Sequence, residues 1–124
     1  MTVYVDDMRA PYGRYIMCHC WADTRDELFA MMQTIGVQLK WFQRPASTCD
    51  VAFGMEASWE HFDIAWSKRA LAIKAGAVEV SIFVMAEHAN RQNFIKAVDR
   101  SNWQAATRCL RMMTLAHASG VRRL

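Results

Sequence analysis

Hydrophobic residues run through this chain in two patterns, one typical of strands and the other typical of helices. Residues 2–5 and 15–21 are short apolar runs, and each predicts a strand. Between them, residues 10–13 contain Pro and Gly and predict a turn. Residues 38–43 and 77–81 predict two further strands. These segments are expected to form the β-sheet of the fold.

Between the strands, apolar residues recur at intervals of three and four and predict helices. Thr24 and Glu27 match a capping box, in which the two side chains close the first turn of a helix, and Gly36 ends that helix. Residues 64–75 predict a second helix with Asp63 as its N-cap. Strands and helices alternate along the chain, which favours a sheet with helical cover.

After Ser81 the pattern is helical. Residues 82–98 predict one helix, and a start resembling a capping box at Ser101 predicts another that ends near Gly120. The apolar stripe of the last helix consists of Trp103, Ala106, Leu110, Met113 and His117. We interpret this stripe as core or as a dimer seam, so a homo-oligomer is possible.

The chain has 124 residues, of which 53% are hydrophobic, and it fits one domain with a substantial core. We expect an α/β fold, a single domain with a small mixed β-sheet, covering helices and a C-terminal helical extension. Residues 1–82 are expected to form the core, with a loop insertion near 44–60. Residues 83–124 are expected to form a basic helical extension packed on that core.

No apolar run approaches the roughly 20 residues that a membrane span needs, and the start lacks the features of a signal peptide. We therefore expect a cytoplasmic protein with no membrane partner. Its cysteines, Cys18, Cys20, Cys49 and Cys109, are expected to be reduced thiols. Cys18, His19 and Cys20 resemble a metal cluster, but neighbours on a strand point to opposite faces, so no metal site is predicted.

Charge is distributed unevenly along the chain. Residues 1–87 carry eight basic and eleven acidic side chains, a net charge of −3, whereas residues 88–124 carry seven basic side chains and one acidic, a net charge of +6. Such a basic tail suits an anionic partner, a nucleic acid or an acidic protein face, although a solvated helix face is an equal alternative. The candidate partner-binding residues are Arg100, Arg108, Arg111, Arg122 and Arg123.

The segment from His61 to Arg69 concentrates polar chemistry at the start of a predicted helix. Free N–H groups there favour anions, so a phosphate-type site is plausible. Asp6 ends the first strand, at an edge where α/β sheets often place their sites, and a divalent cation is possible there. The candidate anion or ligand pocket consists of Asp6, Arg14, His61, Asp63, Ser67, Lys68 and Arg69.

Each candidate has a plainer alternative. His61 is either a general base or an imidazole packed beside aromatic neighbours. Ser67 lacks an adjacent base that would make it a nucleophile. Lys68 and Arg69 are adjacent and therefore diverge on a helix. His19, His88 and His117 are isolated in the sequence, and metal ligation by them is not expected.

Several segments, in order, carry a resemblance to a known family. They are VYVDDMRAPYGR at 3–14, ADT and EL within 22–28, IG at 35–36, WFQ at 41–43, and HFDI, SKRA and GAV within 61–78. Over about residues 2–82 the chain resembles the domain-of-unknown-function family 4031, small bacterial and tailed-phage proteins. The family brings no activity with it. Its members have a shorter connection at 46–60, and many lack the helical C-terminus.

Two hypotheses follow for function. The resemblance implies a phage accessory protein, which we expect to act as a binding module on a host or defence factor or nucleic acid through its basic C-terminal helices. The alternative is a phosphate-ligand-binding protein or metal-dependent enzyme acting on nucleotides or nucleic acid. Whether the chain is an enzyme, and which cofactor it uses, stays open at this point.

Overall fold

The computed structural model describes residues 2–46, 51, 53–99 and 103–118. Its strands are β1 (Val3–Val5), β2 (Ala10–Tyr12), β3 (Tyr15–Ala22), β4 (Gln43–Arg44), β5 (Met55–Glu56), β6 (Phe62–Ala65) and β7 (Val78–Glu79). Its helices are α1 (Arg25–Ile35), the 3₁₀ turn η1 (Leu39–Trp41), α2 (Trp66–Lys74), α3 (Ile82–Asp99) and α4 (Trp103–Ala118).

The long strand β3 is the centre of the main sheet. Its two halves pair antiparallel with β2 and β1, and β6 pairs antiparallel with it through residues 17–20. Strand β1 also pairs with β7, in parallel. The sheet is therefore mixed, and the expected α/β class is confirmed.

Alternation along β3 divides its side chains between the two faces of the sheet. Cys18 and Cys20 are completely buried on the face covered by α1 and α2. Phe62 and Ile64 of β6 join them there, together with the apolar face of α1, which comprises Leu28, Met31, Met32 and Ile35. This is the larger of the two cores, and it buries the free thiols of Cys18 and Cys20.

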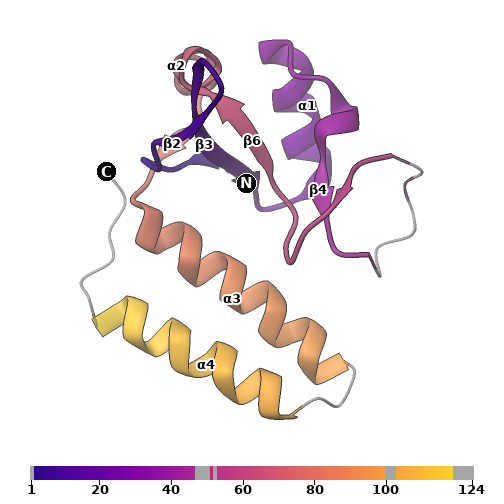
Figure 1. The fold of residues 1–124 in the computed structure, drawn as a ribbon, viewed down its shortest axis with the longest axis vertical. Coiled ribbons are helices and arrows are strands. Elements are labelled where there is room, and N and C mark those ends of the chain that lie inside the picture. The colour runs from indigo at the N-terminus through magenta and orange to yellow at the C-terminus, as the bar shows by residue number, and fades with distance from the viewer. Residues whose placement is uncertain (1, 47–50, 52, 100–102, 119–124) are drawn as a thin grey trace.

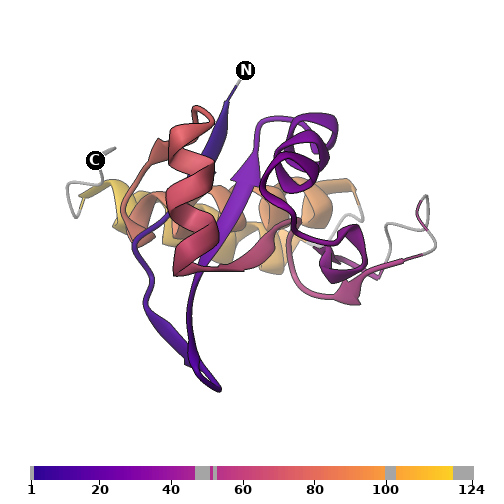
Figure 2. The ribbon, with the colours of Figure 1, turned by 90° about the horizontal axis from the view of Figure 1, so that it is seen from above.

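Helix α3 covers part of the opposite face. Tyr4, Trp21, Trp59 and Val80 form a second core there, against which Val84, Met85 and Ala89 of α3 pack. Helix α4 packs along α3 on the side away from the sheet (Figure 1). Seen from above, α1 and α2 lie over the sheet and the α3–α4 pair lies beneath it (Figure 2). No described helix has the length and apolar character to cross a membrane.

Helix α1 begins and ends as predicted. The Thr24 hydroxyl accepts the backbone N–H of Glu27 and donates to the Glu27 carboxylate at 2.8 Å. Gly36 ends the helix with φ 78°, a left-handed conformation that glycine adopts without steric cost. The N–H groups of Gly36 and Val37 then bond back to the last turn.

Two strand assignments differ from the sequence prediction. Residues 10–13 are predicted as a turn. In the structure, residues 10–12 pair with residues 15–17 and form edge strand β2, and the turn begins only at residue 13. Pro11 fits an edge strand, where no partner requires its missing N–H. Residues 38–43, predicted as a strand, instead form η1 followed by the start of β4.

The prediction of a helix from residue 64 with Asp63 as its N-cap is wrong. Residues 62–65 form strand β6, and α2 begins at Trp66 with Ala65 at the N-cap and no side-chain cap bond. Pairing with β3 and burial of alternate residues override the local helical signal. Within the predicted loop insertion near 44–60, β4 and β5 form a small parallel pair, and residues 47–50 and 52 lie outside the described part.

Candidate functional site

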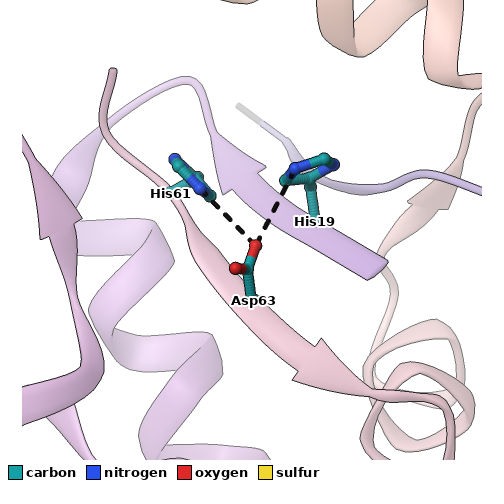
Figure 3. A group of neighbouring side chains, drawn as sticks. All are labelled: His19, His61 and Asp63. Atoms are coloured by element: carbon teal, nitrogen blue, oxygen red, sulfur yellow. Dashed lines mark ion pairs between the residues drawn. The ribbon is translucent and has the colours of Figure 1, made fainter. Parts of the chain in front are cut away.

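Three ligand-type side chains meet on the sheet face opposite the α1–α2 core. His19 lies in the middle of β3, and Asp63 of β6 is its direct partner in the strand register. His61 stands two residues before Asp63, so its side chain points to the same face. Figure 3 shows the Asp63 carboxylate between the two imidazoles. We call His19, His61 and Asp63 the triad.

Both imidazoles direct the same nitrogen at a single oxygen. The Nε2 atom of His61 lies 3.5 Å from Asp63 Oδ1, and that of His19 lies 3.8 Å from it. One ligand atom of each residue lies within 4.8 Å of the others. Ligands bound at about 2.0–2.1 Å to one zinc ion are separated by about 3–3.5 Å, so the triad is close to the spacing of a shared metal ion.

The remaining polar atom of each triad residue is already occupied. His19 Nδ1 lies 2.7 Å from Asp6 Oδ2, and His61 Nδ1 lies 3.1 Å from the Trp59 carbonyl oxygen. Both partner atoms are acceptors, so Nδ1 is the donor nitrogen of each ring, and Nε2 is the ring atom that faces Asp63. Gln43 Nε2 donates to Asp63 Oδ2 at 2.8 Å. Such outer partners orient the ligands of metal sites.

Asp63 Oδ1 is a buried acceptor with no hydrogen bond of ordinary geometry. Burial raises the pKa of this carboxyl, but interactions with His61, Gln43 and His19 outweigh it and hold the pKa below its usual value. Asp63 is therefore a carboxylate at neutral pH. A buried carboxylate oxygen that faces two imidazole nitrogens at 3.5 and 3.8 Å, with no hydrogen bond of ordinary geometry, is a strong site for a cation.

Asp6 lies behind the triad, where it holds His19. It is completely buried, and its Oδ1 accepts the N–H groups of Met8 and His19. Its carbonyl oxygen accepts Arg69 Nε at 2.9 Å. Both carboxylate oxygens of Asp6 are thus engaged by groups of the chain itself.

The pocket predicted from the sequence does not assemble as one site. Arg14 is exposed at the β2–β3 turn and donates to the hydroxyl of Tyr15. Ser67 is exposed on α2, and Lys68 Nζ extends towards Gly36 at the end of α1. Buried Arg69 pairs with Glu79 at 3.1 Å. Only His61, Asp63 and, indirectly, Asp6 of the predicted set lie at one centre.

Aromatic packing holds His61 in place. The Trp59 ring stacks on its imidazole with centroids 4.1 Å apart and an interplanar angle of 16°. His88 of α3 contacts the other side of this cluster, against Trp59 and Trp21. Burial and the Arg91 charge lower the pKa of His88 to about 4, so this imidazole is neutral. The second core therefore holds His61 of the triad in position through the stacked ring of Trp59.

A cavity of about 350 Å³ opens beside the triad. Its described wall consists of Met8, Ala10, Pro11, Tyr12, Met17, Trp41, Gln43, Met55 and Asp63. Asp63 belongs to both the cavity and the triad, and its partner Gln43 stands beside it. No Lys or Arg side chain stands among these lining residues.

Only part of the basic tail lies within the described residues. Arg108 and Arg111 are exposed on α4, where they line a shallow depression with Trp103, Gln104 and Thr107. Arg100, Arg122 and Arg123 lie outside the described residues. Trp103 and Leu110 of the predicted stripe are 64% and 52% exposed, so they are not core residues, whereas Ala106 is buried.

Sequence reasoning missed His19. Strand alternation correctly separates it from Cys18 and Cys20, but its actual neighbours come from β6, more than forty positions along the chain. The sequence signal was available in part, since His61 and Asp63 have the two-residue spacing that places side chains on one strand face. Nothing local indicates that this strand pairs with β3.

Comparison with known proteins gives one match. The family model described as "Protein of unknown function (DUF4031)" matches residues 3–92, from β1 into α3. This span contains the whole triad and its outer partners but not α4. Searches of curated proteins and of solved structures found no match.

Proposed function

This chain belongs to the DUF4031 family, and we propose that it is a metal-dependent enzyme whose His19, His61 and Asp63 hold one divalent transition-metal ion. The observation that carries the proposal is the convergence of two imidazole Nε2 atoms on Asp63 Oδ1, a buried oxygen with no hydrogen bond of ordinary geometry. A cation at that point satisfies all three atoms together.

The donor set favours a borderline metal. Two imidazoles and one carboxylate suit Zn²⁺ or Fe²⁺, whereas Ca²⁺ and Mg²⁺ prefer oxygen ligands throughout. Three protein ligands also leave a coordination position for water or substrate, which is typical of catalytic sites, because structural zinc sites take four protein ligands. When bound, the ion acts as a Lewis acid and lowers the pKa of a bound water.

The chain's own residues then have distinct parts. Asp6, the Trp59 carbonyl and Gln43 fix the two imidazoles and the carboxylate in the orientation that a metal needs. The cavity next to Asp63 supplies the place for a ligand. This arrangement corresponds to the metal-dependent alternative from the sequence; it keeps His61 and Asp63 of the predicted pocket and adds His19.

Metal titration of chelator-treated protein tests the proposal. We expect one Zn²⁺ or Co²⁺ per chain by isothermal titration calorimetry, with Co²⁺ absorption bands that report nitrogen and oxygen ligands. Asp63→Asn is expected to weaken binding by more than the roughly 10- to 100-fold effect of an outer partner. Glu56→Gln, an exposed carboxylate on β5, is the matched control. Unchanged affinity in Asp63→Asn would contradict the proposal.

A second proposal concerns α4. The exposed Trp103 ring stands beside Arg108 and Arg111 in one depression, and an aromatic platform flanked by cations suits single-stranded nucleic acid. We propose that the chain is a phage protein and that, in the cytoplasm of the host cell, this face of α4 binds a nucleic acid. An acidic host or defence protein is the competing partner.

Charge reversal separates these possibilities. In a pull-down from host lysate, the parent protein is expected to capture its partner with an affinity that falls steeply as the salt concentration rises. The double variant Arg108→Glu and Arg111→Glu is expected to lose this capture. The double variant Arg14→Glu and Lys74→Glu, at two exposed positions outside α4, is the control for net charge, because it changes the charge by the same amount. Capture that survives nuclease treatment would favour the acidic protein, and binding that is independent of salt would contradict the electrostatic surface altogether.

A further inference from the structure

The cavity beside Asp63 lies on the same face of the sheet as the triad. Met17 stands two residues from His19 on β3 and therefore points to the same side. Ala10 of β2 is the register partner of Met17, and Asp63 closes the wall next to the triad. A molecule in the cavity thus lies within reach of an ion at Asp63.

The wall of this cavity is mainly apolar. Three methionine side chains, those of Met8, Met17 and Met55, line it together with the rings of Pro11, Tyr12 and Trp41. Trp41 and Met55 are 49% and 45% exposed, and Tyr12 is 74% exposed. Methionine and aromatic side chains adapt readily to apolar ligands.

Charge in the cavity argues against a phosphate ligand. The side chains of the described wall that carry hydrogen-bonding groups are those of Tyr12, Trp41, Gln43 and Asp63, and no Lys or Arg is among them. A phosphate group in this cavity would lie near the Asp63 carboxylate, and within the described wall the metal ion would be the one positive charge available to offset the two negative groups. An apolar group meets complementary surface instead.

We infer that the cavity binds the aromatic or similarly flat apolar part of a small molecule whose single oxygen-donor group, such as a carboxylate or hydroxamate, reaches the metal at the triad. The metal-binding part of this inference rests on the proposed function. A cavity of about 350 Å³ is large enough for one or two rings, since a cavity of roughly 150 Å³ holds benzene.

Two probes with one head group measure the contribution of the cavity. Benzohydroxamate and acetohydroxamate chelate a metal in the same way, and the first has a phenyl ring where the second has a methyl group. With Zn²⁺-loaded protein we expect benzohydroxamate to bind about 10- to 100-fold more tightly, the benefit of burying one aromatic ring. Equal affinities with the metal in place would overturn the inference and leave the metal proposal standing.

A filled cavity supplies the matched variant. Ala10→Trp is expected to reduce benzohydroxamate affinity to that of acetohydroxamate, with Zn²⁺ affinity and circular dichroism unchanged. Ala70→Trp, on the exposed side of α2, is the control with the same chemical change. Undiminished preference for benzohydroxamate in Ala10→Trp would place the ring elsewhere and overturn the inference.

Metal-free protein tests the apolar part alone. Fluorine NMR with 4-fluorotoluene is expected to show binding that Ala10→Trp abolishes and Ala70→Trp retains. If the protein binds no metal but binds this probe, the proposed function fails while the apolar site stands. If it binds metal but not the probe, the inference fails and the proposed function stands.

Discussion

The carboxylate of Asp6 holds the imidazole of His19 from behind. Asp6 Oδ2 lies 2.7 Å from His19 Nδ1, while Oδ1 accepts the backbone N–H of the same residue at 2.9 Å. This double contact fixes both the ring and the strand that carries it. The second ring nitrogen is thereby turned to Asp63, so a completely buried acid determines the geometry of a partly buried site.

Asp6→Asn is expected to weaken Zn²⁺ binding by about 10- to 100-fold, because the amide is a weaker acceptor for His19 Nδ1–H. The measurement is calorimetric titration of metal-free protein. Asp7→Asn is the control: Asp7 is the exposed neighbour, and its carboxylate accepts the N–H of Ile82 at the start of α3. This control should leave metal affinity unchanged. Equal loss in both variants would contradict an orienting role for Asp6.

Added metal is expected to stabilise the fold. An ion that binds the native state alone raises the free energy of unfolding by about 2.7 kcal/mol at one hundred times its dissociation constant. The increase should appear as a higher denaturation midpoint with Zn²⁺ and disappear with a chelator. His19→Ala should remove the response, and His88→Gln, outside the triad, should retain it. A metal response that survives His19→Ala would argue against ligation by His19.

His88 is expected to make the fold sensitive to mild acid. Its pKa is about 4 in the folded protein against an ordinary value of 6.5, because of burial and Arg91, with Asp23 opposing and His61 adding to the effect. The unfolded chain therefore binds the proton first, and stability falls as pH drops from about 6.5 towards 4.

The His88→Gln variant measures this effect. Between pH 7.5 and 5, the parent protein should lose about 2 kcal/mol more unfolding free energy than the variant, in urea titrations at each pH. Comparison of the two proteins cancels the titration of other groups that both share. Parallel pH curves would show that His88 titrates alike in the folded and unfolded chains.

The two core cysteines are expected to be inert in the native state. Burial, which has the largest effect, and the charge of Asp6 raise the pKa of Cys18 to about 12. Burial also raises the pKa of Cys20. In a Cys49→Ser, Cys109→Ser variant, a thiol reagent at pH 8 should label nothing until denaturant is added. Rapid labelling of the native variant would contradict the packing of Cys18 and Cys20.

Local signals in the sequence predicted those elements that local interactions stabilise. The α1 helix has its cap at Thr24, its stop at Gly36 and an apolar face at helical spacing, so sequence and structure agree there. Residues 62–65 directly precede a helix, and the sequence predicts residues 64 and 65 as part of it. Residues 62–65 form a strand instead, because they pair with β3 and bury alternate side chains. The turn predicted at 10–13 became β2 for the same reason.

The candidate site shows the same division. The sequence determined that Cys18 and Cys20 share a buried face and that His19 points away, because alternation is a property of the strand itself. The sequence also indicated His61 and Asp63 as candidate ligand-binding residues. Only the tertiary structure decided that Asp63 lies opposite His19, since strand register depends on packing between distant segments. The α/β class was therefore present in the sequence, and the metal-type triad arises from the pairing of β3 with β6.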